Sequence, residues 1–175
     1  DVDALNNRAG LRWRTGNIFG ALEDYERALA IDPQAGQLYF YRGQLHYANN
    51  DLQRAEADFS RAIQSGADLP EVYFYRGVGR YECGQFAEAS ADFDAALRGQ
   101  PEETSRYYYR RALAQHQLGQ WREAIGDYQR VLSVWTHHEG AQYHLQLAQG
   151  LHRPEPIRPL AKRADSELSQ ASMGW

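Results

Sequence analysis

The sequence is poor in several residue types that define particular classes of protein. It has one cysteine, Cys83, which cannot form a disulfide within the chain or hold a multi-cysteine zinc site. It has no run of eighteen apolar residues, so no membrane-spanning helix is expected. The 19 basic residues are outnumbered by 23 acidic ones, and this balance excludes a general nucleic-acid binder that neutralises phosphates. Stability must therefore come from side-chain packing.

The residues that are present describe one ordinary soluble domain of 175 residues with an excess of aromatic side chains, twelve Tyr, four Trp and six Phe. Lys162 is the only lysine, and this preference for arginine favours a bacterial source. The chain starts at Asp1 without an initiator methionine and shows no signal-peptide pattern, so we expect a processed or excised piece. The compartment stays open, with the cytoplasm slightly favoured.

An internal repeat organises most of the chain. Small residues recur at intervals of 34, 34 and 35, and an aromatic residue follows the second small column at a fixed offset of four. Columns that repeat in step four times indicate a repeat architecture. The first small column is Ala9, Gly43, Gly77 and Ala112, the second is Ala21, Ala55, Ala89 and Ala124, and the aromatic column is Tyr25, Phe59, Phe93 and Tyr128.

Each unit has the spacing of two helices joined by a short turn. Turn residues lie between the small columns, and apolar residues recur at i, i+3 and i+7 on either side of them. Glycine is costly in a helix, so its recurrence at Gly43 and Gly77 predicts that an aromatic of the second helix packs over the missing side chain. The second helices carry acidic residues that are expected to face water: Glu23, Asp24, Glu26, Glu56, Asp58, Glu88, Asp92 and Asp94.

These columns resemble the tetratricopeptide repeat (TPR) family, whose pattern is an aromatic, a large residue followed by Gly or Ala, then Ala, an aromatic and Pro. The third unit carries it as Tyr73, Arg76, Gly77, Ala89, Phe93 and Pro101. Arginine stands where the family more often has leucine, at Arg8, Arg42, Arg76 and Arg111. The resemblance implies an all-α fold, a right-handed α–α superhelix of four hairpins in residues 1–136, with repeats at about 2–35, 36–69, 70–104 and 105–138.

The pattern weakens in residues 137–175. Apolar residues at helical spacing in 141–151 and again in 157–171 suggest two further helices, separated by a proline-rich stretch at 154–159. We interpret this region as a degenerate capping hairpin that covers the last repeat, since solenoids need such caps. A linker leading to another domain is the alternative.

The residues capable of chemistry do not form a recognisable catalytic or metal-binding motif. No histidine and aspartate pair is placed near Cys83 to activate it. His137, His138, Glu139 and His144 lack metal-ligand spacing, since adjacent helical residues point about 100° apart. No phosphate-binding loop or nucleophile elbow occurs. We therefore expect no enzyme activity, no metal and no cofactor.

The resemblance places the first helix of each hairpin on the inner, concave surface, and residues there that are not needed for packing form the candidate binding site. The candidates are rich in aromatic side chains, which mark partner surfaces when exposed, and Phe40, Phe74 and Tyr109 are expected to face the groove. Two arginines one turn apart are suited to a partner carboxylate. The set is Trp13, Phe40, Gln44, Tyr47, Phe74, Val78, Tyr81, Arg106, Tyr109, Arg110 and His116.

The function expected from this surface is a protein-interaction module or scaffold that binds a peptide or helix of a partner protein. The carboxylate clamp of chaperone-binding relatives is incomplete, since Phe40, Gln44 and Tyr75 occupy its other positions. Two alternatives stay open. In the first, the chain is a self-assembly scaffold that forms a homo-oligomer. In the second, it is the regulatory domain of a larger multidomain protein. RNA binding is disfavoured by the acidic second helices.

Overall fold

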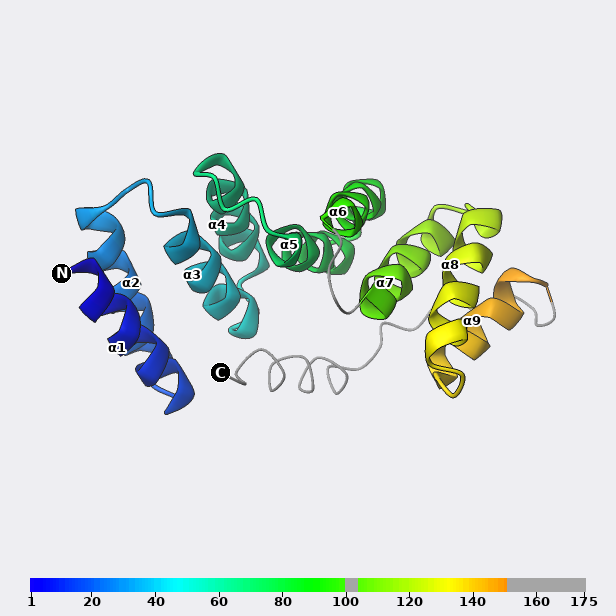
Figure 1. Ribbon diagram of the computed structural model, residues 1–175, viewed down its shortest axis with the longest axis horizontal. Coiled ribbons are helices and arrows are strands. Elements are labelled where there is room, and N and C mark those ends of the chain that lie inside the picture. Colours follow the sequence, from blue (N-terminus) through cyan, green and yellow to red (C-terminus); the bar gives the residue numbers. More distant parts are fainter. Residues whose placement is uncertain (100–103, 151–175) are drawn as a thin grey trace.

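The computed structural model describes residues 1–99 and 104–150 of the chain, and these residues form nine α-helices and no strand. Consecutive helices pair into four hairpins followed by a single helix (Figure 1). The all-α repeat solenoid expected from the sequence is confirmed. The helices are α1 (Val2–Arg14), α2 (Ile18–Ile31), α3 (Gly36–Ala48), α4 (Leu52–Gln64), α5 (Pro70–Glu82), α6 (Phe86–Arg98), α7 (Thr104–Gln117), α8 (Trp121–Val134) and α9 (Glu139–Ala148).

The turn within each hairpin is fixed by one residue with a left-handed backbone. Glycine adopts this conformation without steric cost, and asparagine tolerates it better than most residues. The next helix then begins at a polar residue, as at Asn17 and Asp51, whose side chains accept a hydrogen bond from the backbone of the first turn. The four turn residues are Gly16, Asn50, Gly84 and Gly119, with φ of 80°, 62°, 78° and 73°.

The two helices of a hairpin approach closely because an aromatic ring fills the space left by a small residue. A Cβ on Gly43 would lie 2.8 Å from Phe59 Cε1, and a Cβ on Gly77 would lie 2.9 Å from Phe93 Cε1. Both rings are fully buried. This confirms the packing expected from the repeating glycines.

An ion pair between a partly exposed arginine and a buried aspartate joins the two helices of every hairpin, and this was not expected. An arginine of the first helix donates two hydrogen bonds to an aspartate sixteen residues later, at N–O distances of 2.6 to 2.9 Å. These aspartates are at most 6% exposed, so the expectation that Asp24, Asp58 and Asp92 face water is wrong. The pairs are Arg8–Asp24, Arg42–Asp58, Arg76–Asp92 and Arg111–Asp127.

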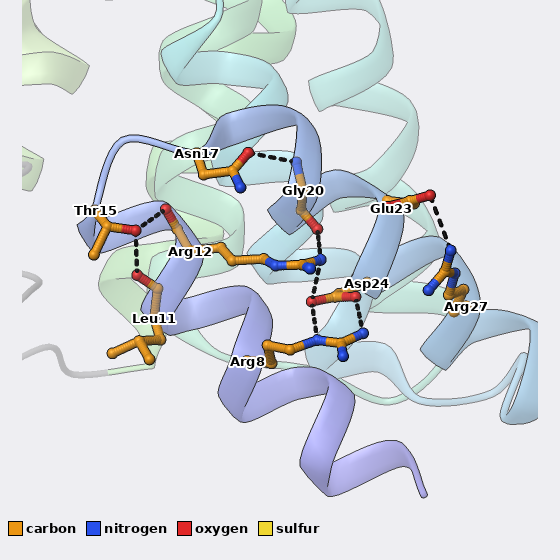
Figure 2. A network of polar contacts seen from close by, with 9 residues as sticks. All are labelled: Arg8, Leu11, Arg12, Thr15, Asn17, Gly20, Glu23, Asp24 and Arg27. Carbon is orange, nitrogen blue, oxygen red and sulfur yellow. Dashed lines mark hydrogen bonds and ion pairs between the residues drawn. The ribbon is translucent and has the colours of Figure 1, made fainter.

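In the first hairpin a second arginine completes the network (Figure 2). Arg12 Nη1 lies 2.8 Å from Asp24 Oδ2 and also donates to the carbonyl oxygen of Gly20. The pKa of the Asp24 carboxyl lies below its ordinary value because Arg8 donates hydrogen bonds to it, with Arg12 adding to the effect. Arg8 stands where the family more often has leucine, and its partner, Asp24, lies in the same hairpin.

The odd-numbered helices form the inner side of the array. In the described part of the chain, α3 contacts α5, α5 contacts α7 and α7 contacts α9, whereas consecutive even-numbered helices make no comparable contacts. Closer spacing on one side of a stack of hairpins curves the stack toward that side. Figure 1 shows α4 and α6 along one side of the middle of the row and α3, α5 and α7 along the other. No helix in the described ranges is long and apolar enough to cross a membrane.

The cap expected after the fourth repeat is described only in part. α9 packs on α8 and contacts α7. The second helix expected at 157–171 lies outside the described residues. Whether residues 137–175 are a cap or a linker stays a prediction, as do the repeat boundaries.

Candidate functional site

The inner face carries one aromatic column that remains partly exposed. Trp13, Tyr47 and Tyr81 occupy the same register on α1, α3 and α5, and each is intermediate between buried and exposed. Tyr47 and Tyr81 also contact the hydrophobic cluster of the following hairpin, so each ring bridges two repeats. The Tyr47 hydroxyl donates a hydrogen bond to Glu82 Oε1 at 2.8 Å, which orients the ring along α5.

The second predicted column is buried, and the expectation that it faces the groove is wrong. Phe40 is 8% exposed, Phe74 is 1% exposed and Tyr109 is 7% exposed. In each case a ring from the next repeat covers the side chain. The covering contacts, as distances between ring centroids, are Phe40–Tyr75 at 5.9 Å, Phe74–Tyr107 at 4.6 Å and Tyr109–His138 at 4.4 Å.

The two residues predicted between these columns differ in exposure. Gln44 on α3 is partly exposed and remains available as a polar group on the inner face. Val78 on α5 is 3% exposed and belongs to the cluster built around Phe74 and Phe93. Val78 therefore packs the repeat, and its expected exposure is wrong.

The two arginines expected to hold one carboxylate have different surroundings. The guanidinium carbon of Arg106 lies 5.2 Å from the centre of the Phe74 ring and 5.0 Å from that of Tyr107, and Arg106 Nη2 donates to the Tyr107 hydroxyl. Arg106 is thus partly exposed but oriented by aromatic rings. Arg110 is 9% exposed. A guanidinium buried to this extent is not presented to solvent, so the expectation of a matched exposed pair is wrong.

His116, predicted at the fourth position of the exposed column, is 8% exposed and lies in an aromatic cluster. Its ring centroid is 4.7 Å from Trp121 and 5.9 Å from His144, and its Nδ1 lies 3.4 Å from the Tyr128 hydroxyl. Burial lowers the pKa of His116. Burial also raises the pKa of the neighbouring Tyr109 to about 12. Both side chains are therefore neutral near pH 7.

The structure adds residues to the candidate set. Tyr41 and Tyr75 are partly exposed and bridge consecutive hairpins, since the Tyr41 ring stacks on Tyr25 and the Tyr75 ring contacts Tyr47 at 6.3 Å. Their register beside the predicted columns was the available signal. The aspartate partners of the arginines were also detectable, because Asp24, Asp58, Asp92 and Asp127 repeat in step with those arginines.

The described residues show no arrangement that matches a metal centre or an activated nucleophile. Within 1–99 and 104–150, no group of three or more His, Cys, Asp or Glu side chains is placed to hold a metal ion. Cys83 is exposed, and partial burial with the nearby Glu56 and Glu82 raises the pKa of its thiol. A thiol with a raised pKa is a weaker nucleophile at neutral pH. The inner face itself presents aromatic side chains and a few polar groups.

Solved structures with the same fold include several helical-repeat proteins. YrrB, described as a TPR protein with an unusual peptide-binding site, has a TM-score of 0.82 and 19% identity, covering 86% of this chain and 77% of its own. MamA has a TM-score of 0.80 and 18% identity, covering 99% of this chain and 96% of its own. The first TPR domain of Spaghetti (RPAP3), bound to the HSP90 peptide SRMEEVD, has a TM-score of 0.62 and 21% identity, covering 69% and 94%.

These identities are low, so the likeness establishes the fold. No curated protein matches the chain. The sequence profile of the tetratricopeptide repeat matches residues 2–70 and 76–153, which together make up more than half of the chain. The protein therefore belongs to the tetratricopeptide repeat family.

Proposed function

We propose that this chain is a protein-interaction module that binds a peptide or helix of a partner protein on the inner face of its odd-numbered helices, without catalysing a reaction. The observation that carries the proposal is the column formed by Trp13, Tyr47 and Tyr81. These side chains have the same register on three consecutive inner helices and keep part of their surface exposed. Two structural neighbours, YrrB with its peptide-binding site and the RPAP3 domain bound to an HSP90 peptide, support this class of function.

Aromatic side chains of this kind are suited to binding because they are rigid and present much apolar area. Tyr and Trp dominate binding energy at protein interfaces, since they lose few rotamers when they are covered. The packing of Tyr47 and Tyr81 against the following hairpin holds both rings in place before a partner arrives. A preorganised ring costs less entropy on binding than a mobile one.

The chemistry of the surface indicates the kind of partner. The aromatic column favours a partner segment whose apolar or aromatic side chains are spaced so that each one contacts a different hairpin. Gln44 can form hydrogen bonds with the backbone of that segment. Arg106 lies at the far end of the face, where an acidic side chain of the partner is favoured. We therefore expect a segment with apolar residues along its length and an acidic residue toward the α7 end.

The test begins with a random-peptide display library selected against the full chain. A fluorescently labelled peptide from the enriched pool then measures affinity by anisotropy for wild type and for a Tyr47→Ala, Tyr81→Ala double variant. We expect at least a thirtyfold loss, since each truncated aromatic costs about 1 kcal/mol or more. Phe74 is unsuitable for this test, since it is 1% exposed and its removal would open a core cavity.

The matched control is Phe19→Ala. Phe19 is 86% exposed and lies on the outer helix α2, so its removal also deletes exposed aromatic area. Affinity of this variant is expected to equal that of wild type. Equal affinity of the double variant, or a loss only in the Phe19 variant, would refute the inner-face proposal. Sedimentation velocity over a hundredfold range of protein concentration tests the self-assembly alternative. Self-assembly predicts that the mass rises with protein concentration in the absence of peptide.

A further inference from the structure

α9 is held on the fourth hairpin by histidine and tyrosine rings. His144 of α9 stacks on Tyr128 of α8, with ring centroids 5.9 Å apart and an interplanar angle of 22°. Its ring is also 5.9 Å from His116 of α7. His138, which directly precedes α9, contacts Tyr109 of α7. His116 and His144 are 8% and 4% exposed, so this interface is nearly closed to water.

One hydrogen bond at this interface requires a neutral histidine. His138 Nδ1 accepts a hydrogen bond from the backbone N–H of Ala141 at 3.1 Å and so caps the start of α9. A protonated ring has a hydrogen on both nitrogens and loses this acceptor. Within the part of the chain that the structure describes, the buried His144 Nδ1 and Tyr109 hydroxyl have no hydrogen-bond partner. Protonation of His144 would therefore add a charge to a site without an acceptor at Nδ1.

The surrounding groups do not compensate such a charge. The pKa of His144 is lowered to about 4, first by burial and then by His116 and His138. Burial also lowers the pKa of His138. On α8, Asp127 precedes Tyr128 and already binds two arginines. Among the described residues, the titratable and charged groups around the cluster are Tyr81 from α5, Tyr109, Arg110 and His116 from α7, Asp127 and Tyr128 from α8, and His138 and Tyr143 from the loop and α9 itself.

The first turn of α9 lies directly on a side chain of the inner face. A Cβ on Gly140 would clash with the Tyr109 hydroxyl, so a larger residue at this position requires the Tyr109 ring or α9 to move. Tyr109 has the same register as Phe40 and Phe74, and α9 with its preceding loop supplies the rings that cover it. Detachment of α9 would expose Tyr109 and His116 on α7.

We propose that α9 is an acid-released cover: it packs on the fourth hairpin at neutral pH, and protonation of His138 and His144 detaches it and exposes the aromatic surface of α7 and α8. This release follows from the interface itself and does not depend on peptide binding. The additional inference that release of α9 extends the binding face to the fourth hairpin rests on the proposed function.

The sign and size of the effect follow from the pKa difference. A released histidine titrates near its ordinary pKa of 6.5, whereas docked His144 titrates near 4. Docking is therefore favoured fully above pH 6.5 and is lost as the pH falls from there toward 4. Between pH 7.5 and pH 5.0, His144 alone shifts the equilibrium about twenty-five-fold toward the released state. His138 and His116 shift it in the same direction.

The experiment is hydrogen–deuterium exchange of the full chain at pH 7.5 and pH 5.0, corrected for the intrinsic pH dependence of amide exchange. We expect protection in residues 139–148 to fall at least tenfold at pH 5.0, while α2 stays protected. The α2 helix is the internal control, since neither helix of the first hairpin carries a histidine. Unchanged protection of α9, or equal loss across all helices, would overturn the proposal.

Two pairs of variants isolate the cause. His144→Phe keeps an aromatic ring and removes one titrating group, so α9 should lose less protection at pH 5.0, whereas His137→Phe, at an exposed position in the same loop, should behave as wild type. Gly140→Ala should release α9 even at pH 7.5, whereas Gly126→Ala, in α8 with nothing within 4 Å of its new Cβ, should not. Proton NMR titration of the histidine rings in the wild-type protein tests the same cause without any variant. An ordinary pKa for His144 would refute the proposal that α9 is an acid-released cover.

Release of α9 and peptide binding are measured separately. The labelled peptide defined above is titrated against wild type at both pH values. A pH-dependent α9 without peptide binding at either pH would leave the cover standing and refute the proposed function. Peptide binding with an α9 that stays protected at pH 5.0 would refute the cover alone.

Discussion

Replacement of Asp58 by alanine should cost much more stability than replacement of an exposed acid on another helix. Asp58 accepts two hydrogen bonds from Arg42, at 2.8 and 2.7 Å, and its side chain is 8% exposed. Its removal leaves the Arg42 guanidinium, 20% exposed, without its carboxylate partner. Loss of one partner of a buried ion pair costs about 3 to 5 kcal/mol.

The expected value is smaller than that upper range, because Arg42 keeps some contact with water and lies over the Tyr39 ring, 5.5 Å from its centre. We therefore expect a loss of about 2 to 4 kcal/mol in the free energy of unfolding. The matched control is Glu23→Ala. Glu23 forms an ion pair with Arg27 in which both side chains are 56% exposed, and such pairs contribute less than about 0.5 kcal/mol.

The assay is urea unfolding followed by circular dichroism, with the two single variants and an Arg42→Leu, Asp58→Ala double variant. The double variant removes both charges, so it should be more stable than Asp58→Ala alone. Leucine is the residue that the tetratricopeptide repeat family more often has at the position of Arg42. A loss for Asp58→Ala no larger than that for Glu23→Ala would refute the role given to the buried pair.

Two further predictions concern the packing and the titration of the hairpins. Gly77→Ala should destabilise the protein by about 1 to 3 kcal/mol because the new Cβ would lie 2.9 Å from Phe93 Cε1. Gly126→Ala should stabilise it by up to about 1 kcal/mol because nothing lies within 4 Å of its new Cβ. Urea unfolding measures both changes. The pKa of the Asp24 carboxyl is lowered by hydrogen bonds from Arg8, so its stabilising effect is present above pH about 4 and is lost as the pH falls through the lowered value. Asp24→Asn should flatten this acid dependence of stability, and an unchanged dependence would exclude Asp24 as its source.

The repeat fold could be predicted because its determinants are local and periodic. Ala, Gly and aromatic columns recur in the sequence with the same period as the hairpins in space. Gly43 and Phe59 illustrate this, since the missing Cβ of one is filled by the ring of the other within the same hairpin. A contact that closes within one repeat can be inferred from the register of that repeat alone.

The exposure of the inner face could not be predicted in the same way, because it depends on contacts between repeats. Phe40 has the register of an inner-face residue, but Tyr75 of the next repeat covers it. Tyr109 is covered by His138 and His144, which lie beyond the last clear repeat. The register predicts which side of the helix a residue occupies, and the size of its neighbour in the next repeat determines whether it is exposed.

The buried aspartates show a second limit. Asp24 lies on a helix with Glu23 and Glu26, and hydrophobic pattern alone places all three acids on a solvated face. Burial of Asp24 becomes favourable only because Arg8 of the first helix reaches it with two hydrogen bonds. Pairing across helices must therefore be considered before an acid is assigned to the surface.

The most direct test of the binding surface is chemical-shift mapping of a selected peptide on the isotopically labelled full chain. We predict that the largest perturbations fall on the inner helices, at Gln44, Tyr47 and Tyr81, with little change at Phe19 and elsewhere on α2. Perturbations that cluster on the even-numbered helices, with the Tyr47 and Tyr81 signals unmoved at saturation, would contradict the proposed function.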